Sequence, residues 1–162
     1  MKLATYSGSE ATIYSVILEE DEQRQITLFE HFVTENLKEH HEEVKDIASR
    51  LIVIGTKTGA RDIYFKDWEG KPGDGVCALF DNPDKHLRLY CIRFGKGVLI
   101  VGGGGYKPKS IKAFQESNKL TNENEYMRIF SREIEAKIKE RDLTFSPDGT
   151  ELFGDFNFYS HE

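Results

Sequence analysis

The chain has 162 residues, of which 38% are hydrophobic and 31% charged, and its net charge is −6. This length is typical of one domain with a buried core, so we expect a single domain over residues 1–162. The acidic surplus excludes a protein that binds nucleic acid through its overall charge, and it disfavours adsorption to anionic membranes.

Three features typical of membrane or secreted proteins are missing from the sequence. No run of 18 apolar residues suggests a membrane span, and the first residues lack the apolar stretch of a signal peptide. The two cysteines, Cys77 and Cys91, are too few for a disulfide framework and form no CxxC pair. The sequence therefore predicts a cytoplasmic protein.

The first third of the chain predicts one strand and two helices. Residues 11–18 are β-branched and aromatic, which indicates a strand. Residues 22–40 and 42–54 carry apolar side chains at helical spacing. We expect these two helices to form a hairpin with His40 and His41 at the bend.

The middle of the chain predicts an antiparallel sheet. Short strands at 62–66 and 76–80 precede a hairpin, whose strands Leu87–Phe94 and Val98–Val101 are joined by the tight turn at 95–97. Alternation gives the first hairpin strand two different faces. One face carries Leu87, Leu89 and Cys91, and the other carries Arg88, Tyr90 and Ile92.

The last part of the chain predicts further helices. A short helix is expected at about 110–119, and a longer one from about 122 to 141, with Thr121 or Asn122 as its cap. A closing edge strand is expected within 152–158. The predicted fold class is therefore α+β, with an N-terminal helical hairpin packed on a central antiparallel sheet and with C-terminal helices.

Four consecutive glycines, Gly102–Gly105, follow the hairpin. Such a tract can cradle a phosphate, but it forms neither a Walker A motif nor a GxGxxG pattern. We favour a strand end, a bulge or a close backbone crossing that leaves no room for side chains.

Basic residues gather around the hairpin, where no acidic residue occurs between Lys85 and Gln115. Interleaved aromatic and basic side chains are typical of a phosphate-binding groove, although lysines at the ends of strands and helices are often only solvated. His86, just before the hairpin, is a candidate general base. No histidine, cysteine or carboxylate spacing indicates a metal site, and no cofactor is expected. The basic and aromatic residues of this stretch are Arg88, Tyr90, Arg93, Lys96, Tyr106, Lys107, Lys109 and Lys112.

The segment from about 76 to 119 resembles the core of the RelE/ParE toxin superfamily, including its phage-derived and HigB-like branches. The similarity lies in Arg88–Arg93, the turn at 95–97, the apolar strand Val98–Val101 and the small and basic segment 104–109. It implies a RelE-like core over about residues 22–140, with extensions at both ends. It also implies a toxin that cleaves mRNA, free or on the ribosome, or poisons gyrase, and that a partner antitoxin neutralises.

The resemblance also implies roles for individual residues. Arg88 matches the strand arginine that contacts the scissile phosphate, and Lys107 matches the basic residue after the last strand. Tyr106 is implied to stack on a base or transfer a proton, with His86 as a second proton-handling group. The remaining expected RNA contacts are Tyr90, Arg93, Lys109 and Lys112. The chain departs from nuclease members at Leu79, Phe80 and Asp81, where those proteins place lysines.

The sequence thus predicts a RelE/ParE-like toxin of a toxin–antitoxin system, either an mRNA-cleaving ribonuclease or a degenerate relative of one. The alternative is a non-catalytic protein-interaction module on the same scaffold, which binds through a sheet edge or the groove beside the hairpin. Nucleotide binding at Gly102–Gly105 is a third and weaker hypothesis.

Overall fold

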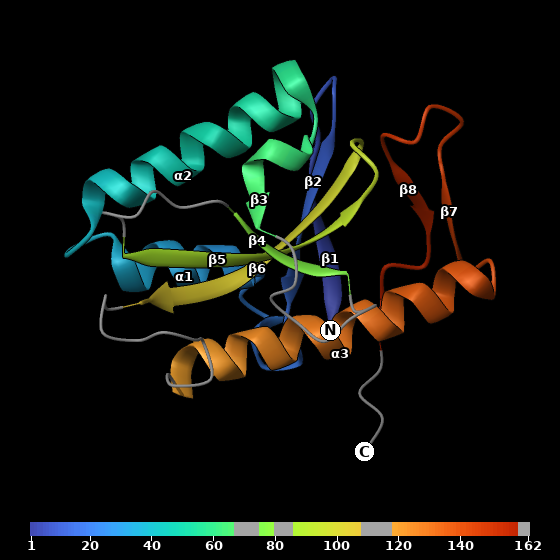
Figure 1. Ribbon diagram of the computed structural model, residues 1–162. Coiled ribbons are helices and arrows are strands. Elements are labelled where there is room, and N and C mark those ends of the chain that lie inside the picture. The colour runs from blue at the N-terminus through green and yellow to red at the C-terminus, as the bar shows by residue number, and fades with distance from the viewer. Residues whose placement is uncertain (67–74, 80–85, 108–117, 159–162) are drawn as a thin grey trace.

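A six-stranded mixed sheet with helices on both faces forms the body of the protein (Figure 1). The computed structural model describes residues 1–66, 75–79, 86–107 and 118–158. Neighbouring strands are antiparallel except β2 and β6, which run parallel. In spatial order the strands are β1 (Lys2–Tyr6), β2 (Thr12–Ile17), β6 (Val98–Tyr106), β5 (Leu87–Phe94), β4 (Val76–Leu79) and β3 (Phe65–Lys66).

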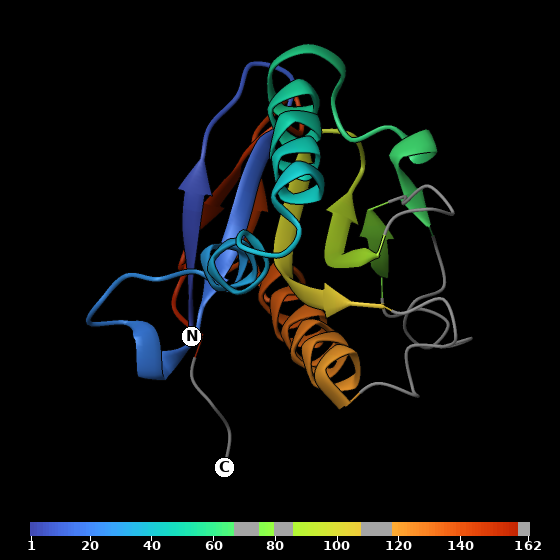
Figure 2. The same cartoon turned by 90° about the vertical axis from the view of Figure 1, so that its left-hand side faces the viewer.

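Helices cover the two faces of the sheet unequally (Figure 2). Helices α1 (Leu28–Asn36) and α2 (His41–Val53) lie on one face, and the longer α3 (Asn118–Lys139) lies on the other. None of the helices in the described ranges is both long and apolar enough to span a membrane. The smaller elements are the 3-10 turns η1 (Glu19–Asp21) and η3 (Asp62–Tyr64), the π-turn η2 (Ile54–Thr58), and the separate hairpin of β7 (Leu143–Phe145) and β8 (Leu152–Gly154).

The predicted order of elements, with an N-terminal helical hairpin on an antiparallel sheet, is wrong. β1 and β2 precede α1, and the parallel pairing of β2 with β6 makes the sheet mixed. The sequence signal for β1 is weak because five residues at the chain start form only a short alternating pattern. The pairing of β2 with β6 joins distant segments, so no local pattern specifies it.

The two predicted helices of the first third are present as α1 and α2, but α1 is shorter than expected. Its start is fixed by a capping box: the Thr27 hydroxyl accepts from the Glu30 N–H, and the Glu30 carboxylate accepts from the Thr27 N–H. α3 begins at Asn118, so Thr121 and Asn122 lie inside it and do not cap it. The short helix expected at 110–119 lies almost entirely outside the described residues.

The two predicted faces of β5 are confirmed, and each contributes to a separate core. Leu89 and Cys91 belong to the core beneath α1 and α2, whereas Tyr90 and Ile92 belong to the core beneath α3. Both cores contain fully buried aromatic and aliphatic side chains. The sheet therefore has apolar side chains on both faces in its central strands, as expected of strands covered on both sides.

The glycine tract lies inside β6 and allows a close approach of neighbouring elements. The β5–β6 register shifts by one residue beside Gly102 and Gly103, which is a bulge. A Cβ atom at Gly103 would overlap the Glu123 carboxylate of α3, and one at Gly104 would overlap the Arg88 carbonyl oxygen. The whole tract is buried. These contacts explain the glycines by packing, in agreement with the close crossing favoured from the sequence.

Candidate functional site

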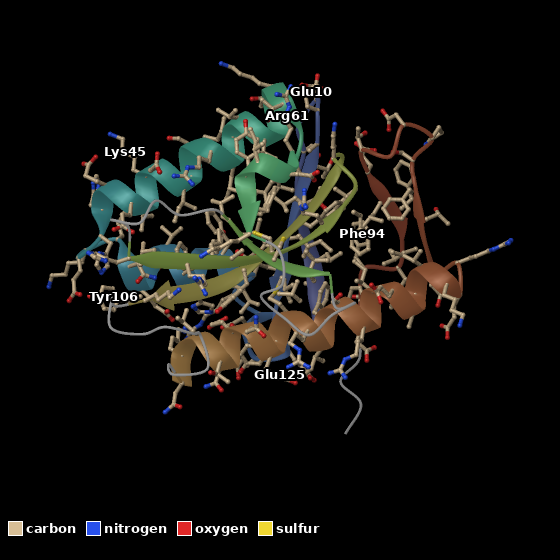
Figure 3. The ribbon with its side chains drawn as sticks, in the orientation of Figure 1. Glu10, Lys45, Arg61, Phe94, Tyr106 and Glu125 are labelled. Atoms are coloured by element: carbon tan, nitrogen blue, oxygen red, sulfur yellow. The ribbon has the colours of Figure 1, made fainter. Side chains whose placement is uncertain are left out.

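Three rings from separate parts of the chain meet at one end of the sheet. The His40 ring stacks on the Tyr106 ring with centroids 5.3 Å apart and an interplanar angle of 20°. The His86 ring lies 5.5 Å from the Tyr106 ring and 6.1 Å from the His40 ring. We call His40, His86 and Tyr106 the His–Tyr cluster. Figure 3 shows Tyr106 at the outer end of β6.

Local structure brings each member of the His–Tyr cluster to this place. His40 is the residue before α2, His86 the residue before β5, and Tyr106 the last residue of β6. β5 and β6 are antiparallel, with Leu87 opposite Tyr106. The start of one strand and the end of the other therefore lie side by side, and the start of α2 lies over them.

Glu43, in the first turn of α2, fixes the position of His86. Both of its carboxylate oxygens accept the His86 backbone N–H, at 3.0 and 3.1 Å, and one also accepts the Leu87 N–H at 2.9 Å. Charge-assisted hydrogen bonds of this kind are stronger than neutral ones. α2 and the start of β5 are therefore held together next to the His–Tyr cluster.

The His–Tyr cluster is partly open to solvent. The Tyr106 side chain is 45% exposed, whereas His40 and His86 are half-buried. The Nδ1 atom of His86 is buried and has no hydrogen-bond partner among the described residues. Two imidazoles can act as an acid and a base, and an exposed phenol ring face can stack against a planar ligand.

Charged side chains surround the same end of the sheet. The Lys107 N–H donates to the His86 carbonyl, which places Lys107 directly beside the cluster. Lys119 of α3 forms ion pairs with Glu123 at 2.8 Å and with Glu35 of α1 at 3.1 Å. Burial lowers the pKa of Lys119, but the hydrogen bonds and charges of Glu123 and Glu35 outweigh this and raise its pKa above the ordinary value.

Two predicted RNA-contacting residues do not reach this open end. Arg88 is only 3% exposed and Tyr90 is fully buried, and Tyr90 packs in the core beneath α3. Alternation along β5 places Arg88 on the same face. Arg88 and Tyr90 therefore contribute to the interior of the protein rather than to an exposed groove.

Arg93 is also separated from the His–Tyr cluster. It lies near the far end of β5, about 20 Å from Leu87 at the usual rise of a strand. Its guanidinium forms an ion pair with Asp62 at 2.7 Å and lies over the Phe65 ring. The hydrogen bond from Arg93 holds the pKa of Asp62 below its ordinary value. The other two predicted RNA contacts, Lys109 and Lys112, lie outside the described residues.

The predicted site is thus partly assembled. The structure brings together His86, Tyr106 and the backbone of Lys107, and it adds His40 and Glu43, which sequence reasoning did not select. The only sequence signal for His40 was its place at the predicted helical bend. Within the described part of the chain, no three His, Cys, Asp or Glu side chains are grouped closely enough to hold a metal ion.

Comparison with known proteins gives no relative from which to transfer a role. No family model matches the chain, and no curated protein or solved structure shows significant similarity to it.

Proposed function

We propose that this protein is a RelE/ParE-like toxin that cleaves mRNA in the cytoplasm, with the His–Tyr cluster as its catalytic site. The observation that carries the proposal is the meeting of two histidines and an exposed tyrosine at one end of the sheet. Cleavage of RNA requires no cofactor, because the neighbouring 2′-hydroxyl can serve as the nucleophile. The chain then needs a general base, a general acid and a cationic group.

In the proposed reaction, one imidazole takes the proton of the 2′-hydroxyl as its oxygen attacks the adjacent phosphorus. The other imidazole donates a proton to the departing 5′-oxygen. The products are a 2′,3′-cyclic phosphate and a 5′-hydroxyl. We assign these two roles to His40 and His86, because their ring centroids lie only 6.1 Å apart at the partly open end of the sheet.

Tyr106 and Lys107 have supporting roles in this proposal. The exposed ring of Tyr106, already stacked on His40, offers a face to one base of a single-stranded RNA. Lys107 supplies positive charge near the phosphate, as a point charge rather than a bidentate fork. Arg88 receives no catalytic role, because its burial separates it from an RNA backbone at this surface.

The test is inducible expression in bacteria, with growth and the integrity of a reporter mRNA as readouts. Wild-type protein is expected to arrest growth and fragment the message, whereas His40→Ala and His86→Ala abolish both effects. His41→Ala is the matched control, because this neighbouring histidine is exposed and its ring forms an ion pair with the adjacent Glu42. Equal toxicity and cleavage for all four proteins would refute the assignment of the site.

A non-catalytic protein-interaction module is the second candidate function. The burial of Arg88 and Tyr90 favours it, since two of the expected contacts with RNA are used for packing instead. An interaction module leaves mRNA intact on expression and captures a specific protein partner in a manner independent of His86. An antitoxin encoded beside the toxin is the partner expected under the first proposal.

A further inference from the structure

The described residues cover only about half of the outer edge of β1. The segment before the C-terminus pairs with its first residues: the Leu3 N–H donates to the Phe156 carbonyl at 3.1 Å, and Met1 exchanges hydrogen bonds with Phe158. In a strand, the backbone N–H and C=O groups of every second residue face the same neighbouring strand. The Leu3 carbonyl and both backbone groups of Thr5 therefore also face outward, away from β2. These groups have no partner among the described residues. Figure 2 shows β1 at one edge of the sheet, beside α2 rather than beneath it.

An apolar pocket of about 330 Å³ adjoins this open edge. It lies between the α1/α2 face of the sheet and the last turns of α2, and two large apolar side chains at its rim, Tyr6 and Ile52, are 42% and 64% exposed. The volume is within the range of pockets that bind small ligands or single large side chains. The residues that line its interior include Ile13, Ser15, Phe29, Ala48, Leu51 and Val101.

The wall of the pocket is built from an unusual backbone. α2 ends in the π-turn η2, a rare conformation that is frequent at functional sites. The Gly55 carbonyl of this turn accepts the N–H groups of Glu10 and Ala11, at 2.9 and 3.1 Å. A Cβ atom at Gly8 would overlap the same carbonyl, so the β1–β2 connection can close against the turn only with glycine there. The pocket is therefore a fixed part of the fold.

The unpaired edge and the pocket are connected by small side chains. Ala4 of β1 and Ser15 of β2 are register partners, and alternation places both on the α1/α2 face. A strand added beside β1 would project every second side chain onto this face. A side chain of the added strand next to Ala4 would lie on the same face as the pocket, in line with Ala4 and with Ser15, which forms part of the lining.

We propose that this edge binds an extended segment of a partner protein, which adds a seventh strand beside β1 and inserts one large apolar side chain into the pocket. Unpaired backbone groups select an occupant with a backbone of its own, which a lipid or a small apolar molecule lacks. The pocket then gives specificity for one leucine, isoleucine or phenylalanine side chain. This site is separate from the His–Tyr cluster, so it does not depend on the proposed nuclease activity.

The test is to select peptides that bind the full-length protein from a display library of random ten-residue sequences. The affinity of a selected peptide for the protein is then measured by fluorescence polarisation. The enriched peptides are expected to share one large apolar residue, flanked at alternate positions by strand-forming residues. Thr5→Pro removes the outward N–H without breaking the β1–β2 ladder, because proline is tolerated on an edge strand. Ile52→Lys places a charge at the exposed rim. Each variant is expected to weaken binding by about tenfold or more, which corresponds to about 1.4 kcal/mol.

Two control variants distinguish loss of the edge from a general change in the protein. Thr5→Val keeps the N–H group and is expected to bind within about twofold of wild type, and His86→Ala is expected to bind normally because it changes only the His–Tyr cluster. Urea unfolding confirms that each variant is folded. The proposal is overturned if no peptide is enriched, or if Thr5→Pro and Ile52→Lys bind as wild type does. It is also overturned if wild type forms a dimer that Thr5→Pro dissociates, since a second copy then occupies the edge.

Discussion

Replacing Gly104 by alanine tests the packing that brings Tyr106 to the cluster. The added Cβ atom would overlap the Arg88 carbonyl oxygen on β5, which is backbone in the adjacent strand. Neither strand can move aside easily, because this part of β6 is paired with β5 and packed against α3, whose Glu123 and Lys119 side chains lie close to Gly103 and Gly105. Overpacking of a core costs about 1–3 kcal/mol when side chains can adjust. Since backbone must adjust here, we expect a loss of about 3 kcal/mol.

The neighbouring Gly105→Ala provides a matched control. Its Cβ atom would lie 3.2 Å from the Lys119 Cγ atom, in a side chain that can shift, so we expect a change within about 1 kcal/mol. For a chain of this length, about 3 kcal/mol lowers the melting temperature by about 6–12 °C. Urea unfolding of both variants, followed by circular dichroism, measures the difference. Equal stabilities for Gly104→Ala and Gly105→Ala would show that the tract does not pack as described.

Three further predictions concern the cluster, its support and an ion pair near the C-terminus. Tyr106→Ala is expected to weaken binding of single-stranded RNA by about tenfold, because loss of base stacking costs about 1–3 kcal/mol. Tyr106→Phe keeps the ring and is expected to bind normally. Equal RNA affinities for the two variants in fluorescence polarisation assays would argue against stacking. Glu43→Ala is expected to destabilise the fold by about 2 kcal/mol and to speed hydrogen exchange of the His86 and Leu87 amides, which donate to the Glu43 carboxylate. Unchanged exchange of these two amides would contradict this. The hydrogen bond from Lys137 lowers the pKa of Asp155 from its ordinary 3.8 to about 2. The ionised Asp155 carboxylate therefore stabilises the folded protein fully above pH 3.8, and this stabilisation is lost as the pH falls through 2. The stability difference between wild type and Lys137→Met should therefore shrink on acidification, and a difference that stays constant from pH 5 to pH 2 would exclude this linkage.

Local patterns predicted the parts of the fold that depend on local periodicity. The alternation of β5 correctly separated its two faces, and α2 lies where its apolar spacing placed it. The position of β1 and the parallel pairing of β2 with β6 were missed. β1 is too short for its alternation to stand out without its pairing to β2, and the pairing of β2 with β6 joins segments separated by about half of the chain.

The candidate site likewise combines residues that a local sequence pattern indicates with residues whose positions depend on packing. The sequence indicates His86 by its place just before a clear hairpin strand, and it indicates Tyr106 by the interleaved aromatic and basic residues and by the RelE/ParE resemblance. His40 was not selected, because its contact with Tyr106 arises only when α2 packs over the end of the sheet. The RelE/ParE resemblance and the basic stretch predict that Arg88 contacts RNA, but its face of β5 is covered by α3.

The central claim is that the His–Tyr cluster cleaves RNA through the 2′-hydroxyl. It is tested most directly with purified protein and an oligonucleotide of DNA that contains a single ribonucleotide, with mass spectrometry of the products. We predict cleavage only after the ribonucleotide, with a 2′,3′-cyclic phosphate and a 5′-hydroxyl at the new ends, and no product with His40→Ala or His86→Ala. An intact oligonucleotide, or cleavage that persists when the ribonucleotide is replaced by its deoxy form, would contradict the claim.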